Sequence, residues 1–398
     1  MSLSKLINRV EDSITLAISA KAKAMKAEGI DVIGLSAGEP DFDTPEHIKQ
    51  AGIKAINDGV TKYTPAAGLP ALRKAIAQKF ENDNGLSYKP EEIIVGCGAK
   101  HSVFTAVIAL IDEGDEVIIP TPYWVSYPEM VKVAAGTPVI VETTGESNLK
   151  LTPEQLQEAI TPKTKLLILN SPSNPSGMVY TKEELQALAD VLAKTDVYVI
   201  SDEIYEKILY DNATHHSIAG LDSELFKRTI TINGVSKTYS MTGWRIGYSA
   251  GPLEVIKAMG KLQSQETSNP CSISQMATIE AITGSQDCVK MMVEAFDQRR
   301  RYLVDRLNKM QGVSCVNPQG AFYAFPDFSG NFGKSFDGKR ISGSVDMCNF
   351  LLDEMKVAAV PGAGFGADKH LRLSYAASLE SLEKALDRIE QGLARLSA

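Results

Sequence analysis

The sequence predicts an α/β protein in which a mainly parallel sheet of seven strands lies between two layers of helices, beside a second, smaller α+β domain. From Val32 onward, short apolar runs alternate with helical patterns, as in strands joined by crossover helices. Most of these runs are apolar on both faces, which is typical of strands covered by helices on either side. After Cys271 helical patterns dominate and the apolar runs shorten, which indicates the second domain.

The apolar runs fix the expected strands of the large domain. In chain order they are Ile93–Val95, Glu116–Ile119, Pro138–Val141, Leu166–Leu169, Val197–Ile200, Thr229–Ile232 and Arg245–Tyr248. Helical patterns lie between them, as at 103–111, 153–160 and 183–193. Thr152 and Thr181 stand where helices begin, and each is followed within the first turn by acidic or amide side chains, so both are expected to be N-caps.

The second domain is expected to contain long helices and short strands. A charged helical stretch, 287–310, is expected to bridge the two domains. Shorter strands are predicted at Val313–Val316, Ala321–Phe325, Val357–Val360 and Leu371–Tyr375, with a long glycine-rich loop at 329–343. We therefore expect a large domain of residues 43–288 and a small domain built from residues 1–42 together with 289–398.

Composition excludes several classes of protein. The chain has 398 residues, with 41 Lys and Arg against 49 Asp and Glu, a formal charge of −8, and its basic residues are scattered, which argues against nucleic-acid binding. We interpret the run Arg299-Arg300-Arg301 as a solvated helix face. The five cysteines are widely spaced and form no C-x-x-C pair, which favours reduced thiols in the cytoplasm over a disulfide scaffold or a metal site. No stretch resembles a signal peptide or a membrane-spanning helix.

Polar clusters follow the predicted strands at their carboxyl ends, where open α/β sheets bind ligands. A glycine turn, Gly96 to Lys100, precedes a helix and offers amide donors to an anion, although such a turn is more often only a matter of backbone geometry. Asp202 ends a buried strand, where a carboxylate is costly unless it meets a cation. Lys237 follows the next strand, and partial desolvation there favours the neutral, nucleophilic amine.

Two nucleotide-binding motifs are not met. Gly96-Cys97-Gly98-Ala99-Lys100 continues with His101 where G-x-G-x-x-G requires glycine. The segment 329–335 lacks the leading glycine of a phosphate-binding P-loop, because that position is Phe328. With Tyr205 three residues after Asp202, the clusters at the sheet edge offer an anion site, a carboxylate that needs a cation, a phenol and a nucleophilic lysine, but neither nucleotide-binding motif.

Segments spread over nearly the whole chain match a known family. They are Gly38–Phe42, Lys62–Thr64, Pro122–Trp124, Asn174-Pro175 with Gly177, Asp202–Tyr205, Ser236-Lys237, Met241–Gly247 and Arg372–Tyr375. In their residues and their order they resemble the class I aminotransferases of fold type I, which use pyridoxal 5′-phosphate, and most of all the bacterial subgroup of aspartate aminotransferases. The resemblance implies the three-layer fold of this family, with a mainly parallel seven-stranded sheet.

The resemblance also implies roles for the cofactor-binding residues. Lys237 would form the Schiff base with the cofactor and then carry the proton between the substrate Cα and C4′. Asp202 would keep the pyridine nitrogen protonated, and Asn174 and Tyr205 would hydrogen-bond the 3′ oxygen of the ring, against which Trp124 would stack. The phosphate would be held by Gly98, Ala99, Lys100, Ser236 and Arg245, and by Tyr63 from a neighbouring subunit, which implies a homodimer with shared active sites.

For the substrate, Arg372 matches the arginine that grips the α-carboxylate, helped by Asn174 and the backbone of Gly38. The resemblance assigns a distal carboxylate to Lys100, Ser13 and Thr15, although Lys100 could equally be a solvated lysine of a first helical turn. Because a lysine is a point charge rather than a fork, tolerance of several dicarboxylic acids, prephenate among them, is plausible.

The implied activity is transfer of the amino group of aspartate to 2-oxoglutarate in a ping-pong cycle through the pyridoxamine form. An aminotransferase for prephenate or aromatic, alanine or kynurenine substrates is the main alternative. A third hypothesis is that the protein is a regulator without enzymatic activity, in which an aminotransferase-like domain senses a ligand. Such regulators carry an N-terminal DNA-binding module, whereas only 37 residues precede Gly38.

Overall fold

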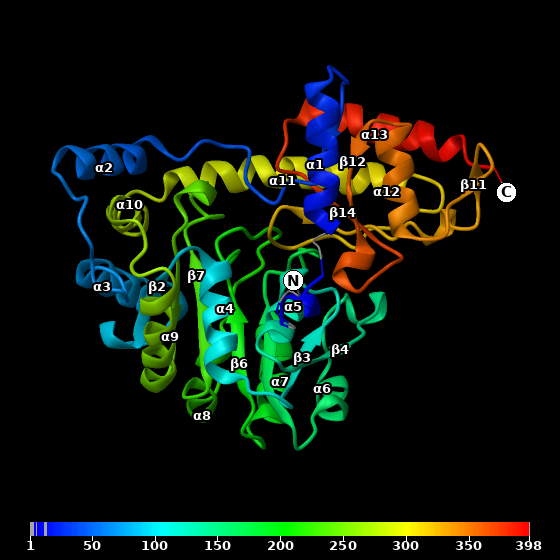
Figure 1. The fold of residues 1–398 in the computed structure, drawn as a ribbon. Coiled ribbons are helices and arrows are strands. Elements are labelled where there is room, and N and C mark those ends of the chain that lie inside the picture. The colour runs from blue at the N-terminus through cyan, green and yellow to red at the C-terminus, as the bar shows by residue number, and fades with distance from the viewer. Residues whose placement is uncertain (1–3, 5, 12–13, 398) are drawn as a thin grey trace.

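A computed structural model describes residues 4, 6–11 and 14–397. Its larger part is built on one seven-stranded sheet (Figure 1). From edge to edge the strands are β2 (Ile93–Gly96), β8 (Gly247–Ala250), β7 (Thr229–Gly234), β6 (Tyr198–Asp202), β5 (Thr164–Asn170), β3 (Glu116–Pro120) and β4 (Thr137–Val141). Only β8 runs antiparallel to its neighbours in this sheet. The predicted mainly parallel, seven-stranded sheet is confirmed.

The strand predicted at 245–248 begins two residues later than expected. Arg245 is not part of it, because its backbone adopts the left-handed conformation (φ 56°) after a 3-10 turn at Thr242–Trp244. The segment between β7 and β8 contains no crossover helix, and a strand that returns without one pairs antiparallel with its predecessor.

Helices cover both faces of the sheet, because successive strand side chains point to opposite sides. Ile168 packs in the core with α4 (Ala99–Leu110), α5 (Ser126–Val133) and α9 (Leu253–Glu266), whereas Leu167 packs with α6 (Pro153–Ala159), α7 (Lys182–Leu192) and α8 (Ser223–Phe226). Thr152 and Thr181 form the predicted N-caps, each within a complete capping box. Within the described ranges, no helix has both the length and the apolar character needed to cross a membrane.

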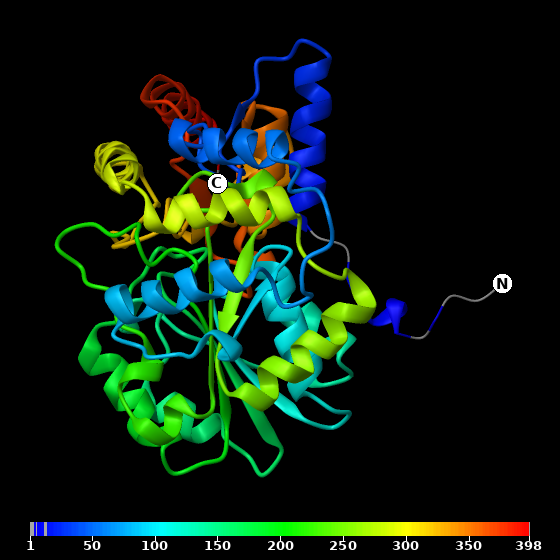
Figure 2. The same cartoon turned by 90° about the vertical axis from the view of Figure 1, so that its left-hand side faces the viewer.

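Three further helices close the β2 edge of the sheet, α2 (Glu46–Asn57), α3 (Pro70–Lys79) and α10 (Ser272–Thr283). Ile48, Leu72 and Ala277 from these helices share one core with Ile93 and Val95 of β2. Figure 2 shows α2 lying along α10 on this side of the molecule.

The smaller part joins both ends of the chain (Figure 1). It contains α1 (Ile14–Ala27), α12 (Ser344–Asp353) and α13 (Leu379–Ala394), and the charged stretch expected to bridge the two parts forms α11 (Asp287–Asn308). In its sheets β1 (Ile33–Gly34) pairs parallel with β12 (Val357–Ala358), and β14 (Leu371–Ser374) lies antiparallel between β13 (Val360–Pro361) and β9 (Tyr323–Ala324). The β1–β12 pairing supports a small domain of 1–42 with 289–398, whose bounds stay a proposal.

Three details of the smaller part differ from the sequence prediction. The strand predicted at Val357–Val360 is divided into β12 and β13, which belong to different sheets. Residues 313–316 form no strand but only a single bridge between Ser314 and Asp327, because they belong to the irregular connection that follows α11. The glycine-rich segment 329–343 is not one long loop, since β10 (Ser335–Phe336) and β11 (Lys339–Arg340) pair within it as a short hairpin.

The interpretation of the arginine run as a solvated face is only partly right for Arg299, whose side chain is 14% exposed and pairs with Asp41 at 2.8 Å. It is wrong for Arg300. Its side chain is only 1% exposed and makes a two-bonded pair with Asp211, at 2.7 and 2.8 Å, while Asp297 accepts from its Nε at 2.9 Å. Arg301 is 66% exposed, as expected of a solvated face. A helical pattern cannot distinguish the two, because Asp211 comes from a distant loop.

We predict that Arg300→Met destabilises the protein by about 2–4 kcal/mol, because it removes the buried cation shared by Asp211 and Asp297 and leaves them only the exposed Arg301. Arg301→Met, the control, should cost less than about 1 kcal/mol, since exposed ion pairs contribute little. Thermal unfolding followed by calorimetry compares the two variants. Equal shifts in melting temperature would contradict the structural role of Arg300.

Candidate active site

A cavity of about 660 Å³ lies at the carboxyl ends of β5, β6 and β7, and residues of the small domain complete its wall. Eleven of the residues predicted from sequence line it: Gly38, Ala99, Lys100, Trp124, Asn174, Asp202, Tyr205, Ser236, Lys237, Arg245 and Arg372. The structure therefore brings together side chains from six separate stretches of the chain. What each can do follows from its contacts.

Asp202 is the last residue of β6 and is buried. The hydroxyl of Tyr127 donates a hydrogen bond to its Oδ2 at 2.6 Å, and the backbone N–H of Ile204 donates to its Oδ1 at 3.3 Å. Burial raises the pKa of Asp202 to about 6, although the Tyr127 hydrogen bond acts in the opposite direction. A carboxylate in this state is stabilised by any cation that enters the cavity beside it.

Tyr127 was not found from the sequence. It lies in α5 rather than directly after a strand, and a buried tyrosine of this kind is indistinguishable in sequence from a core tyrosine. Only its position three residues after Trp124, a residue that the sequence did single out, could have drawn attention to it.

Lys237 follows β7 and extends into the cavity. Its ammonium donates a hydrogen bond to the carbonyl oxygen of Gly38 at 2.5 Å, which joins the N-terminal segment to the large sheet. Burial lowers the pKa of Lys237 to about 8, and the positive charge of Arg372 acts in the same direction. The free amine, the form that attacks a carbonyl carbon, is therefore far more populated near neutral pH than in an ordinary lysine, although the ammonium still predominates at pH 7.

The glycine turn after β2 forms a cradle at the start of α4. Gly98 adopts φ 91° as the residue before the helix, so the first amides of α4 point toward the cavity. Arg245 lies against this turn and donates to the carbonyl oxygens of Thr242 at 2.9 Å and Cys97 at 3.3 Å. The positive φ of Gly98 favours glycine here, and a Cβ atom at this position would also displace the guanidinium of Arg245. With Ser236 nearby on the cavity wall, the cradle suits a phosphate group.

Arg372 projects from β14 and is 5% exposed. Its guanidinium donates to Oδ1 of Asn174 at 3.0 Å and to the carbonyl oxygen of Ser36 at 2.9 Å, and it lies 4.5 Å from the ring centroid of Tyr323. Among the described residues its Nε has no hydrogen-bond acceptor. A buried, incompletely paired guanidinium beside a cavity suits a carboxylate ligand.

The remaining predicted residues lie in different settings. The hydroxyls of Tyr205 and Tyr323 are 2.9 Å apart, and Lys100 Nζ stands 4.8 Å from the ring centroid of Trp124. Lys100 is an exposed residue, but partial burial lowers the pKa of its ammonium, and the charge of Arg245 acts in the same direction. Tyr63 is 91% exposed and does not reach the cavity of its own chain. The predictions made for Ser13 and for the side chain of Thr15 fall outside the described residues.

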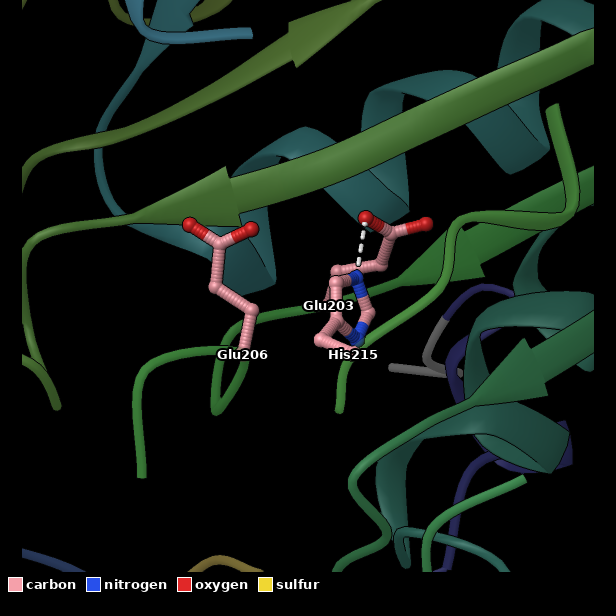
Figure 3. Close-up of side chains that lie close together, drawn as sticks. All are labelled: Glu203, Glu206 and His215. Carbon is pink, nitrogen blue, oxygen red and sulfur yellow. Dashed lines mark hydrogen bonds and ion pairs between the residues drawn. The ribbon is translucent and has the colours of Figure 1, made fainter. Parts of the chain in front are cut away.

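A second polar cluster, Glu203, Glu206 and His215, places its possible ligand atoms within 4.8 Å of one another (Figure 3). Glu203 accepts from His215 Nε2 at 2.9 Å, and Glu206 is ion-paired with Lys79. Burial acts to raise the pKa of Glu206, but Lys79 and His215 outweigh it and hold that pKa near 2. Since these two basic groups compensate the carboxylates, we interpret the cluster as a structural ion-pair network rather than a metal centre.

Comparisons with known proteins agree with this site. An aspartate aminotransferase of Geobacillus stearothermophilus is 55% identical over 394 residues, 98% of each chain. An aspartate/prephenate aminotransferase of Cereibacter sphaeroides is 51% identical over 99% of each chain. The crystal structure of the aspartate aminotransferase from Rhizobium meliloti superposes with a TM-score of 0.96 at 48% identity, and 100% of each chain is covered.

The family model described as aminotransferase class I and II matches residues 30–389, which is most of the chain. The relatives match over their full length and share the fold as well as the sequence. The chain therefore belongs to the class I and II aminotransferases.

Proposed function

We propose that the chain is an aspartate aminotransferase that transfers the amino group of aspartate to 2-oxoglutarate with pyridoxal 5′-phosphate as cofactor. The convergence of Lys237, Asp202 and Arg372 on one cavity carries this proposal. These groups are a lysine whose pKa lies near 8, a buried carboxylate that has no ion pair among the described residues, and a guanidinium whose Nε has no hydrogen-bond acceptor there. Several relatives at 51–55% identity carry the name aspartate aminotransferase, which supports aspartate as the donor.

The residues of the cavity fit the proposed cofactor. When bound, pyridoxal phosphate supplies an aldehyde for the amino group and an electron-withdrawing ring that stabilises negative charge at the substrate Cα. Asp202 would pair with the protonated ring nitrogen, which relieves the cost of burying its carboxylate. The first amides of α4 at Ala99 and Lys100, together with Ser236 and Arg245, would hold the phosphate.

Lys237 would act twice. Its amine would hold the aldehyde of the cofactor, and when an amino substrate is bound instead, the same amine would carry the proton that leaves the substrate Cα. A lysine whose pKa lies near 8 suits both tasks, because it gains and loses a proton easily close to neutral pH. Asn174 and Tyr205 would hold the 3′ oxygen of the ring, and Trp124 would pack on the ring face.

Arg372 would bind the α-carboxylate of the substrate through a bidentate ion pair, with Asn174 beside it. The distal carboxylate is assigned to Lys100, whose position on the cavity wall supports this role, with Ser13 and Thr15 kept as predicted partners. A relative named aspartate/prephenate aminotransferase keeps prephenate as a second candidate acceptor. We propose aspartate as donor because three of the relatives carry it alone in their names.

A homodimer completes the proposal. Tyr63 is exposed on its own chain, so a role at the phosphate requires that it enter the cavity of a partner subunit. The cytoplasmic location expected from the cysteine pattern stays a prediction.

A panel of amino donors tests the substrate. On protein loaded with pyridoxal phosphate, single-turnover loss of the cofactor absorbance should be fastest with aspartate and glutamate, and slower with alanine or aromatic donors. Lys237→Ala should lower the rate with aspartate by about 10³-fold or more, because the proton carrier is lost. Full turnover in this variant, or a preference for alanine, would exclude the proposed function.

The rate at which cofactor-free protein captures pyridoxal phosphate should rise with pH around a midpoint near 8, because only the neutral amine of Lys237 attacks the aldehyde. An ordinary lysine would place this midpoint near 10.4. Arg372→Met removes a positive neighbour and should move the midpoint upward. Stopped-flow absorbance measures both profiles, and a midpoint near 10 in the unsubstituted protein would contradict the buried setting of Lys237.

Arg372→Lys should lower kcat/KM for aspartate by roughly 10²-fold or more, because an ammonium cannot make the two-bonded contact with a carboxylate. Arg306→Lys is the matched control, since Arg306 pairs with Asp387 and Glu390 on the surface of the small domain. Steady-state kinetics separates the two substitutions, and similar values for both would remove Arg372 from substrate binding.

A further inference from the structure

Helix α1 turns one stripe of side chains toward the cavity. Ser19, Ala22, Lys23 and Lys26 all belong to the cavity wall, and they are spaced as neighbours on one face of a helix. None of the motifs that point to an aminotransferase includes this stripe, so the function proposed above does not use it.

The stripe is held in place beside the site of the α-carboxylate. Ile18, Ala22 and Met25 anchor α1 in a small core with Val32 and Leu352. Ser19 Oγ lies 3.4 Å from Ser36 Oγ, and the carbonyl oxygen of Ser36 accepts a hydrogen bond from Arg372. Ser36 therefore contacts both helix α1, through Ser19, and the guanidinium of Arg372.

The two lysines of the stripe carry uncompensated charge. Lys21, on another face of α1, is paired with Asp353 at 2.7 Å. In the described part of the chain no carboxylate lies within ion-pair distance of Lys23 or Lys26, and Lys26 Nζ would stand 3.9 Å from a Cβ atom placed on Gly34. Both side chains reach solvent, so they lie where a ligand enters.

The wall as a whole is cationic. Its described residues include six Lys or Arg side chains but only two carboxylates, Glu39 and Asp202, in a chain whose formal charge is −8. A cleft lined by one sign of charge raises the local concentration of ligands of the opposite sign and the rate at which they enter. The more charges a ligand carries, the stronger this effect becomes.

We propose that Lys23 and Lys26 form a cationic guide that draws dicarboxylates into the cavity and favours them over substrates with a single carboxylate. The guide rests on the proposed function, because it assumes that the ligands of this cavity are amino and 2-oxo acids. Because both lysines lie at the rim of the cavity, they should affect the entry and binding of the substrate but not the chemical step. We therefore expect kcat to stay unchanged.

The test uses three variants of pyridoxal-phosphate-loaded protein: Lys23→Gln, Lys26→Gln and the double substitution. Lys21→Gln is the matched control, because it removes the same charge from another face of the same helix. At about 10 mM salt the double variant should lose roughly three- to ten-fold in kcat/KM for 2-oxoglutarate, and in affinity for maleate measured by calorimetry. Single-turnover rates with alanine, which has no net charge, should change by less than about two-fold.

Salt distinguishes guidance from a structural effect. At about 500 mM salt the Debye length falls to a few ångströms, so the double variant and the unsubstituted protein should converge. A loss that persists at high salt, or an equal loss in Lys21→Gln, would overturn the guide. If the unsubstituted protein fails to transaminate, the proposed function fails instead. Maleate affinity then decides the guide alone: equal affinity in the double variant at low salt overturns it, and weaker affinity supports it.

Discussion

The cavity exists because the guanidinium of Arg372 joins three stretches of chain that are far apart in sequence. It extends from the small sheet, donates to Asn174 in the loop after β5, and donates to the carbonyl oxygen of Ser36 in the N-terminal segment. A buried guanidinium must satisfy its donors, and one partner here belongs to the large sheet while the other belongs to the opposite end of the chain. Arg372 therefore links the two parts beside the cavity that it lines, and its Nε has no acceptor among the described residues.

A second constraint comes from the charges at the strand ends. Burial raises the pKa of Asp202 and lowers that of Lys237, so each group is held in water-poor surroundings that disfavour its charged form. Elsewhere the fold compensates such groups fully, as Lys79 does for Glu206 and as Asp211 does for Arg300. Buried charges that are fully paired, such as those of Glu206 and Arg300, belong to structural networks. Buried groups that are only partly paired, such as Asp202 and Lys237, are typical of a ligand-binding site.

The sequence predicts what depends on local pattern and misses what depends on distant contacts. Short apolar runs, most of them apolar on both faces, predicted all seven strands of the large sheet. Many of the cavity residues lie just after the ends of those strands. The late start of β8 follows from the left-handed backbone of Arg245, which no propensity anticipates. Tyr127 and buried Arg300 were missed because their partners, Asp202 and Asp211, lie 75 and 89 residues away. Helical periodicity shows which face a residue occupies but not what that face meets.

The net charge of −8 and the cationic cavity are compatible because charge acts locally in salt solution. At physiological ionic strength the Debye length is about 8 Å, so a ligand inside the cavity responds to the wall and hardly to carboxylates on the far surface. On that surface many lysines are neutralised within their own helices, as Lys384 is by Glu380. An acidic exterior then repels polyanions while small dicarboxylates still meet a basic entrance. The overall charge therefore bears on macromolecular partners, and the distribution of unpaired lysines and arginines bears on the substrate.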